Sequence, residues 1–395
     1  MRAKTKILLG PPGTGKTTSL LNLVDKYLSQ GVSADRIGFV SFTKKATLEA
    51  VERASRRFQI ESRDLTFFRT IHSIAYRQSA TIASSVMGKE HIREFSKLVG
   101  IPLTGKTGLA DGASSSLSYG DKLLFLEGLS RLRCENLEQV CVSEGEGVDL
   151  ETLDYFSKSY TKYKESQGLI DFTDMLGRFL DRGFAPPLDV LIVDEAQDLS
   201  QLQWRAVAKL AENSSDVYVA GDDDQAIFRW SGADVNHFIN LPGESTVLDQ
   251  SYRIPACVHK LASDLIGRVA NRRKKDFQSA SHGGTVDYVA GIDDLSIEEG
   301  KWLILVRNGY HIPPVVKDLA ARNIPLSERV QVSTIHSSKG GESDNVVLFT
   351  DLSPKTHKAR FNNPDDETRV FYVGATRARK NLYIVTPRTK RGFDI

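Results

Sequence analysis

Cysteine is scarce in this chain of 395 residues, which contains only Cys134, Cys141 and Cys257 and no CxxC pair. An odd, small number of cysteines without spaced histidines excludes a disulfide framework and disfavours a zinc site. We therefore expect a protein of a reducing compartment, the cytoplasm, in which the thiols behave as small apolar groups.

Long apolar runs are also missing. After the basic start, Ile7–Leu9 is the whole apolar run before Gly10-Pro11-Pro12, too short for a signal peptide. No stretch approaches the roughly 18 apolar residues of a membrane span, so we expect no membrane association. Internal repeats and low-complexity tracts are absent as well, which excludes a solenoid.

The sequence has no excess of either charge: 52 Lys and Arg against 50 Asp and Glu give +2. The distribution is uneven, however. Residues 135–154 hold seven acids and no base, residues 268–275 hold five bases, and residues 355–391 hold ten bases and three acids. Each run is either a solvated helix face or part of a binding surface, and the basic runs favour a partly basic groove for nucleic acid.

Short apolar runs that alternate with helical stretches predict an α/β fold with parallel sheets. Four runs come before residue 221 and three after residue 300, which indicates two separate sheets. These runs are Ile7–Leu9, Ile37–Val40, Val190–Val193, Val217–Ala220, Leu303–Val306, Val346–Phe349 and Leu382–Val385. Between them, residues 78–165 predict a mainly helical insertion, with helices over 123–132 and 155–163 and a mobile loop over 105–119.

A phosphate-binding loop follows the first predicted strand. The segment GPPGTGKT matches G-x-x-x-x-G-K-[ST], with the backbone amides, Lys16 and Thr17 as ligands of the β- and γ-phosphates and of Mg²⁺. The alternative, a glycine-rich turn that binds nothing, is disfavoured by this strand–loop–helix context. The residues predicted to hold nucleotide are Gly10, Pro11, Gly13, Thr14, Gly15, Lys16, Thr17 and Thr18.

Two further strand ends carry the remaining polar groups of a hydrolase. Asp194 and Glu195 end a buried run, where Asp194 would hold Mg²⁺ and Glu195 would take the proton of the attacking water. Gln225 ends the segment GDDDQ, and such an amide can sense the γ-phosphate. The acids there are also compatible with a solvated turn.

Nine ordered segments make the chain resemble the UvrD/Rep/PcrA-like group of superfamily 1 DNA helicases. They are the phosphate loop, SFTKKA, RTIHSIAYR, LIDFTDML, DEAQD, GDDDQAIFRWSGAD, QSYR, STIHSSKGGE and FYVGATRARKNLYIV. The resemblance implies two RecA-like P-loop domains, the first over 1–77 and 166–249 and the second over 250–395.

The resemblance also implies the roles of four residues around ATP. Arg253 and Arg377 would be arginine fingers on the γ-phosphate, Tyr252 would stack on adenine, and Glu342 would contact the ribose. A planar guanidinium suits developing phosphoryl charge, although a surface ion pair is the alternative for either arginine.

Contacts to single-stranded DNA are implied in the same segments. Phe42, Phe228 and Trp230 would stack on bases, with Trp230 the most exposed of them. Polar contacts are expected from Thr43, Thr70, His72, Thr334 and His336. Phe228 is also compatible with a core position, and the two histidines with a structural role.

Four departures from the family pattern bear on function. Only six residues precede the predicted first strand, so we expect the family's glutamine-containing adenine-recognition block to be missing and other nucleoside triphosphates to be accepted besides ATP. Pro11 and Pro12 replace small loop residues, and Gly341 and Ser343 flank Glu342 where apolar residues are common. Only about 75 residues separate Arg253 from Val330, so the large second-domain insertion is absent or vestigial.

We therefore expect an ATP- and Mg²⁺-dependent helicase that moves 3′ to 5′ on single-stranded DNA and acts at junctions with duplex. It would be monomeric or weakly associating and would work with replication or repair proteins. The alternative is an ATP-dependent switch or translocase that grips single strands without unwinding. A P-loop kinase fits poorly, because Glu195 and the paired arginines favour hydrolysis.

Overall fold

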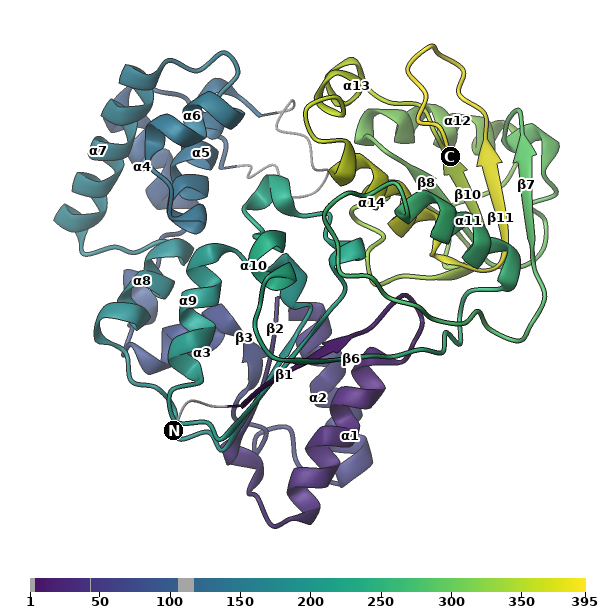
Figure 1. The fold of residues 1–395 in the computed structure, drawn as a ribbon. Coiled ribbons are helices and arrows are strands. Elements are labelled where there is room, and N and C mark those ends of the chain that lie inside the picture. The colour runs from purple at the N-terminus through teal and green to yellow at the C-terminus, as the bar shows by residue number, and fades with distance from the viewer. Residues whose placement is uncertain (1–3, 43, 106–116) are drawn as a thin grey trace.

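Two parallel sheets organise the computed structural model, which describes residues 4–42, 44–105 and 117–395 (Figure 1). The predicted contact of Thr43 and most of the predicted mobile loop lie outside the described residues. In Figure 1 the first sheet lies at the bottom, with a helical unit above it on one side and the second sheet on the other.

The first sheet has the order β3-β2-β4-β5-β1-β6, and every pair of neighbouring strands is parallel. The strands are β1 (Lys4–Leu9), β2 (Ile37–Ser41), β3 (Phe68–Thr70), β4 (Val190–Asp194), β5 (Asp216–Gly221) and β6 (Glu244–Val247). Its main helices are α1 (Lys16–Ser29), α2 (Lys44–Phe58), α3 (Ile71–Gln78), α8 (Phe172–Arg182), α9 (Gln201–Leu210) and α10 (Val235–Ile239). This order brings the carboxyl ends of β1, β4 and β5 together, where open α/β sheets bind ligands.

The second sheet, β7-β11-β10-β8-β9, is also entirely parallel. Its strands are β7 (Thr285–Val289), β8 (Trp302–Val306), β9 (Val330–Thr334), β10 (Ser343–Phe349) and β11 (Ala378–Val385), and its helices are α11 (Ala256–Ile266), α12 (Ile312–Ala321), α13 (Pro354–Ala359) and α14 (Pro364–Ala375). The α/β class and all seven predicted strands are confirmed.

The helical unit contains α4 (Lys89–Val99), α5 (Tyr119–Arg133), α6 (Leu137–Glu144) and α7 (Leu150–Gln167) around its own core, which includes Phe95, Leu126 and Phe156. The chain enters and leaves it at one place, because Met87 N donates to Ile170 O (2.8 Å) and Ile170 N donates to Ser85 O (2.7 Å). The predicted helices near 123–132 and 155–163 correspond to α5 and α7. The predicted division of the chain into domains stays a prediction.

A half-buried ion network joins the helical unit to α8. Arg131 of α5 donates to Asp171 (2.6 Å) and Asp174 (2.9 Å), and Lys164 of α7 donates to the same two carboxylates (2.9 and 2.6 Å). Both acids belong to the segment LIDFTDML. The segment therefore connects the insertion to the first sheet.

The basic run over residues 268–275 is largely not a solvated helix face. Arg273 donates to the carbonyl oxygens of Ile239 (2.9 Å) and Leu241 (2.7 Å) in the first domain. Arg272 donates to Asp224 (2.7 Å), and Lys275 is buried. Much of this run therefore holds the two domains together, and less of it is available to nucleic acid than its charge suggests.

The structure also bears on membrane-spanning helices and on the state of the cysteines. Within the described ranges, no helix combines the length and apolarity needed to cross a bilayer. The three cysteines are free thiols.

Candidate nucleotide site and nucleic-acid groove

The phosphate loop is shaped by glycines with left-handed backbone angles, φ 74° at Gly13 and 76° at Gly15. Gly15 caps α1, so the first amides of the helix are directed at the loop, where an anion is favoured. The hydroxyl of Thr14 donates to Pro11 O (2.8 Å) and closes the turn. The geometry is that of a phosphate cradle.

Lys16 lies between the loop and the end of β4. Its Nζ is 2.6 Å from Glu195 Oε1 and 3.5 Å from Asp194 Oδ1. Burial opposes its charge, but the attraction of the two carboxylates outweighs burial and raises the pKa of Lys16. The ammonium can therefore be exchanged between these carboxylates and an incoming phosphate.

Asp194 and Glu195 occupy different electrostatic environments. Burial raises the pKa of Asp194, whereas for Glu195 the attraction of Lys16 and Lys339 overcomes burial and lowers the pKa. Glu195 has φ 53°, a strained conformation for a residue other than glycine and one common at functional sites. This conformation sets its carboxylate toward Lys16 and Gln197, whose Nε2 donates to it (2.6 Å).

A magnesium ion fits the oxygen donors at this position. The hydroxyl of Thr17, in the first turn of α1, and the carboxylate of Asp194 are the hard ligands that Mg²⁺ prefers. Few protein ligands are typical, because this ion keeps waters and substrate phosphates around it.

Gln225 links both domains. Its Nε2 donates to Asp222 (2.8 Å), and its Oε1 accepts from Arg377 Nη2 (2.9 Å). Arg377 is fully buried, and no carboxylate pairs with it among the described residues. Burial, together with repulsion from Arg253, lowers the pKa of Arg377 to about 9, so an anion at this place would be stabilised.

Arg253 and Glu342 form an ion pair, and Glu342 also accepts from Arg379 (2.9 Å). The predicted finger is thus held by the residue predicted to contact the ribose. Tyr252 is 72% exposed, with its ring open for stacking. The roles of all three residues around ATP stay predictions.

The second domain also contacts the phosphate loop directly. Ser251 Oγ donates to Pro12 O (2.8 Å), and Tyr252 N donates to Gly13 O (2.9 Å). Sequence reasoning missed Ser251, although it lies inside the QSYR segment. It also missed Lys339, which donates to Asp198 (2.6 Å) and to Gln225 O (2.7 Å) from within STIHSSKGGE.

Four rings from three segments of the chain gather beside this site. Phe42 and Phe228 stack with centroids 6.0 Å apart, Trp230 meets Phe228 at 6.4 Å, and His336 meets Trp230 at 6.2 Å. Trp230 was expected to be the most exposed of the three stacking rings; all three are half-buried, and Trp230 packs against both Phe228 and His336. Its Nε1 is buried without a hydrogen-bond partner among the described residues.

Of the four predicted polar contacts that the structure describes, the hydroxyls of the two threonines are hydrogen-bonded within the protein. Thr70 accepts from Ser73 N (3.3 Å) at the start of α3, and Thr334 is buried with its hydroxyl on Ser337 (3.0 Å). Burial lowers the pKa of His72 to about 4 and that of His336 well below its usual value, so both rings are neutral at pH 7. Whether any of them contacts DNA stays a prediction.

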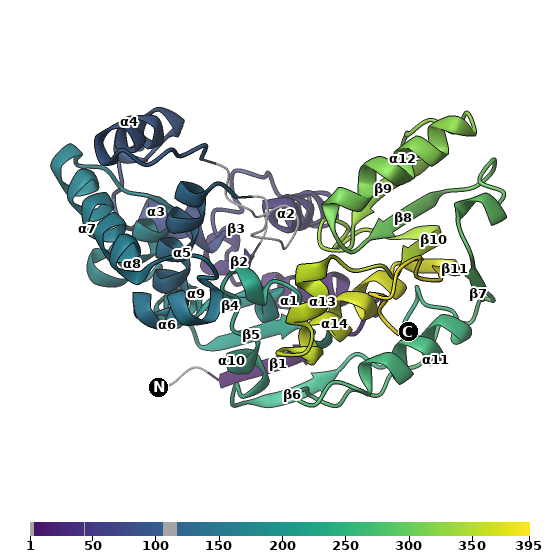
Figure 2. The same ribbon diagram turned by 90° about the horizontal axis from the view of Figure 1, so that it is seen from above.

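A cavity of about 1400 Å³ opens beside the rings, between the insertion, the first domain and the second domain. From above, the insertion and the second sheet lie on opposite sides of the molecule (Figure 2). The cavity is lined by Trp230, His336, Arg229 and Arg307, among others. Arg307 was not predicted; two of its nitrogens bind Glu367, and the third, Nη1, has no hydrogen-bond partner among the described residues.

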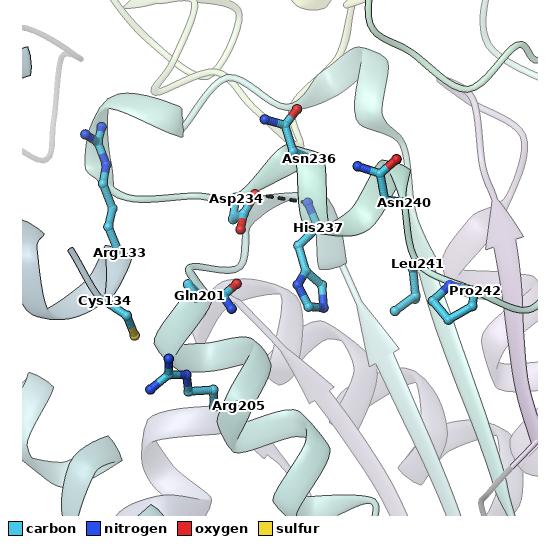
Figure 3. Close-up of a pocket in the computed structure, with 10 residues that line it drawn as sticks. All are labelled: Arg133, Cys134, Gln201, Arg205, Asp234, Asn236, His237, Asn240, Leu241 and Pro242. Carbon is cyan, nitrogen blue, oxygen red and sulfur yellow. Dashed lines mark hydrogen bonds between the residues drawn. The ribbon is translucent and has the colours of Figure 1, made fainter.

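A smaller cavity of about 570 Å³ adjoins this groove on the side of α9 and α10 (Figure 3). Arg133, Gln201, Asp234 and Asn236 line both spaces. In Figure 3, Asp234 accepts from His237 N (2.9 Å), so this acid starts α10. The groove therefore continues along the boundary between insertion and first domain.

The fold and this site define a P-loop protein of two parallel-sheet domains, of the kind that hydrolyses nucleoside triphosphates between them. Residues 2–245 match the UvrD/REP helicase N-terminal domain, and residues 315–389 match the UvrD-like helicase C-terminal domain. The chain belongs to the UvrD/REP family of ATP-dependent DNA helicases.

Individual relatives are distant. The chain is 23% identical to a probable DNA helicase of Mycoplasma pneumoniae over 95% of its own length and 79% of that protein. It is 27% identical to DNA helicase IV of Escherichia coli over 57% of this chain and 38% of that protein. It is 26% identical to the ATP-dependent DNA helicase PcrA of Bacillus subtilis over 75% of this chain and 42% of that protein. The chain thus spans less than half the length of the latter two.

Proposed function

We propose that this protein hydrolyses ATP to move along single-stranded DNA, 3′ to 5′, and that it separates strands at a junction with duplex. The observation that carries the proposal is the convergence of Arg253 and Arg377, from the second domain, on Lys16, Glu195 and Gln225 of the first. Groups from two domains at one phosphate site make closure of the domains depend on nucleotide.

In the proposed cycle, Lys16 exchanges Glu195 for the β- and γ-phosphates. Glu195, released and anionic, then orients a water molecule and takes its proton. Bound Mg²⁺, held by Thr17 and Asp194, would supply charge neutralisation at the phosphates. Arg377 stays on Gln225 and stabilises charge on the γ-phosphate, and Arg253 joins it after leaving Glu342.

Single-stranded DNA would cross the groove beside Phe42, Phe228 and Trp230. Stacking on aromatic rings tolerates any base, as a translocating protein requires. The buried Trp230 Nε1 and Arg307 Nη1 are donors for phosphates or base edges. The direction of movement rests on the family resemblance, and we propose a monomer that works with replication or repair proteins.

The test combines two assays. ATP hydrolysis is measured with and without an oligonucleotide, and strand displacement is measured on duplexes with a 3′ or a 5′ tail. We expect DNA-stimulated hydrolysis and displacement of the 3′-tailed duplex. Preference for the 5′ tail would overturn the polarity.

A second candidate is a translocase or switch that grips single strands without unwinding. It is favoured by the short segment between Arg253 and Val330, where the described elements are α11, β7, β8, α12 and two short 3-10 turns. Single-turnover displacement decides between the two, because stimulated hydrolysis without displacement supports this candidate.

A further inference from the structure

We infer that Lys275 is a positioning residue for ATP hydrolysis, which acts from the second domain by fixing Asp222 and, through it, Gln225 and Arg377. The inference rests on the proposed function, since it assigns Lys275 to the same nucleotide site. Lys275 itself contacts none of the groups predicted to touch ATP.

Lys275 is almost completely enclosed by acids of the first domain. Its side chain is 1% exposed, and its Nζ is 2.5 Å from Asp223, 3.0 Å from Asp224 and 3.1 Å from Asp222. The three carboxylates follow β5 and are themselves 0–2% exposed. A lysine of one domain thus fills an acidic recess at the strand end of the other.

The two oxygens of Asp222 have different partners. Oδ1 faces Lys275 and also accepts from Asp224 N (3.2 Å), whereas Oδ2 accepts from Gln225 Nε2 (2.8 Å). Gln225 Oε1 in turn accepts from Arg377 (2.9 Å). The amide of Gln225 can therefore present only its oxygen to the arginine. This fixed orientation is what a finger on the γ-phosphate requires, because Arg377 then points into the site.

A second branch leads from Asp222 to the proposed base. Asp222 N donates to Gln197 Oε1 (3.1 Å), and Gln197 Nε2 donates to Glu195 Oε2 (2.6 Å). The position of Asp222 is thus shared by the sensor, the finger and the base. Asp223 contacts Lys275 too, but its other contacts are to Arg273 N and, through its own carbonyl, to Arg369.

The charges explain why the cation is needed. Three buried carboxylates whose oxygens lie within 4.8 Å repel one another strongly unless they are compensated. Arg272 compensates Asp224, so Lys275 is the only ammonium or guanidinium within ion-pair distance of Asp222 among the described residues. Its removal would leave Asp222 Oδ1 with the backbone amide of Asp224 alone, so the carboxylate would be held less firmly toward Gln225.

The test measures ATP hydrolysis in the absence of DNA. This measurement does not require strand separation, so it remains valid even if the protein does not unwind duplexes. Lys275→Met keeps the length of the side chain and removes its charge, and Lys274→Met, at the exposed neighbouring position, is the control. We expect kcat to fall at least about tenfold with KM for ATP changed less than about twofold, as for loss of an orienting group. The control should match the wild type.

Two further variants keep the inference falsifiable if Lys275→Met folds poorly. Asp222→Asn and Asp223→Asn each remove one buried charge beside Lys275, but only Asp222 holds Gln225. Of the two aspartate variants, we expect only Asp222→Asn to lose kcat. Combining Lys275→Met with Asp222→Asn should lower kcat little further. Equal losses in both aspartate variants, or a rise in KM in place of the fall in kcat, would overturn the inference.

Discussion

At the scale of the residue, Glu195 combines three unusual properties. It has a left-handed backbone conformation, a lowered pKa and an ion pair with the lysine of the phosphate loop. In the proposed cycle, this ion pair would keep the carboxylate anionic and in place until phosphate attracts Lys16 away. The carboxylate would then become available as a base only after the substrate has bound.

Glu195→Gln tests this role. The amide keeps the size of the side chain but cannot take a proton, so we expect ATP and DNA to bind while turnover falls at least about a hundredfold. Steady-state hydrolysis and nucleotide binding are the measurements, with Glu138→Gln on the exposed side of α6 as control. Retained DNA-stimulated hydrolysis would remove Glu195 from the role of base.

Trp230→Ala tests the groove. Loss of one stacking ring should weaken single-strand binding by about 1–3 kcal/mol, or roughly 5- to 150-fold in Kd, and leave ATP affinity nearly unchanged. Fluorescence anisotropy of a labelled oligonucleotide measures it, and Tyr155→Ala on the exposed face of α7 is the control. An unchanged DNA affinity would count against stacking.

At the scale of the element, the strands and loops that the sequence predicts correctly are those with a recognisable local pattern. The fully buried strands β2, β4 and β8 are continuous apolar runs, and the phosphate loop has a fixed spacing. The short β3, the largely exposed β6 and β7 and the partly exposed β9 were missed, because nothing in their composition separates them from loops. The half-buried state of Trp230 depends on a distant histidine, which no local pattern reveals.

The acidic and basic runs show the same limit. GDDD is compatible with a solvated turn and residues 268–275 with a solvated helix face, because each run alone carries uncompensated charge. In the fold they neutralise each other across the domain boundary. Compensation between segments some 50 residues apart is a property of the tertiary structure.

The contact between the phosphate loop and the QSYR segment can be tested with two glycines that share a positive φ. A Cβ on Gly13 would lie 2.3 Å from Arg253 Cβ, whereas one on Gly15 meets nothing within 4 Å. Gly15→Ala should therefore cost only the backbone strain of about 1–2 kcal/mol. Gly13→Ala should lower the melting temperature further, because Arg253 must also move.

Thermal unfolding of both variants, with and without ATP, measures the difference. Equal destabilisation would mean that the second domain does not rest on the loop in solution.

At the scale of the whole molecule, the insertion is a separate folding unit attached at one place. It has its own core, and its ends are joined by two backbone hydrogen bonds between residues 85–87 and Ile170. The ion network through Asp171 and Asp174, the packing of α5 on α9 and a hydrogen bond from Arg133 to Arg229 O (3.1 Å) are further contacts with the first domain. The insertion can therefore act on a duplex without being part of the nucleotide site.

Replacing residues 88–168 by a short Gly/Ser linker tests this separation. Asp171→Asn and Asp174→Asn are included, so that no carboxylate is left unpaired. We expect ATP hydrolysis to persist within about threefold and strand displacement to be lost, because the groove loses one wall. The double asparagine variant with the insertion intact is the control, and retained displacement would show that strands are separated elsewhere.

The joined ends of the insertion also bear on how such a protein can change through evolution. A segment that leaves and rejoins a domain through adjacent backbone positions can be lengthened, shortened or exchanged by one genetic event, without any compensating change in the sheet below it. The nucleotide site and the segment proposed to meet the DNA junction could then diversify at different rates, and one ancestral protein could acquire new substrates through changes in a single inserted segment.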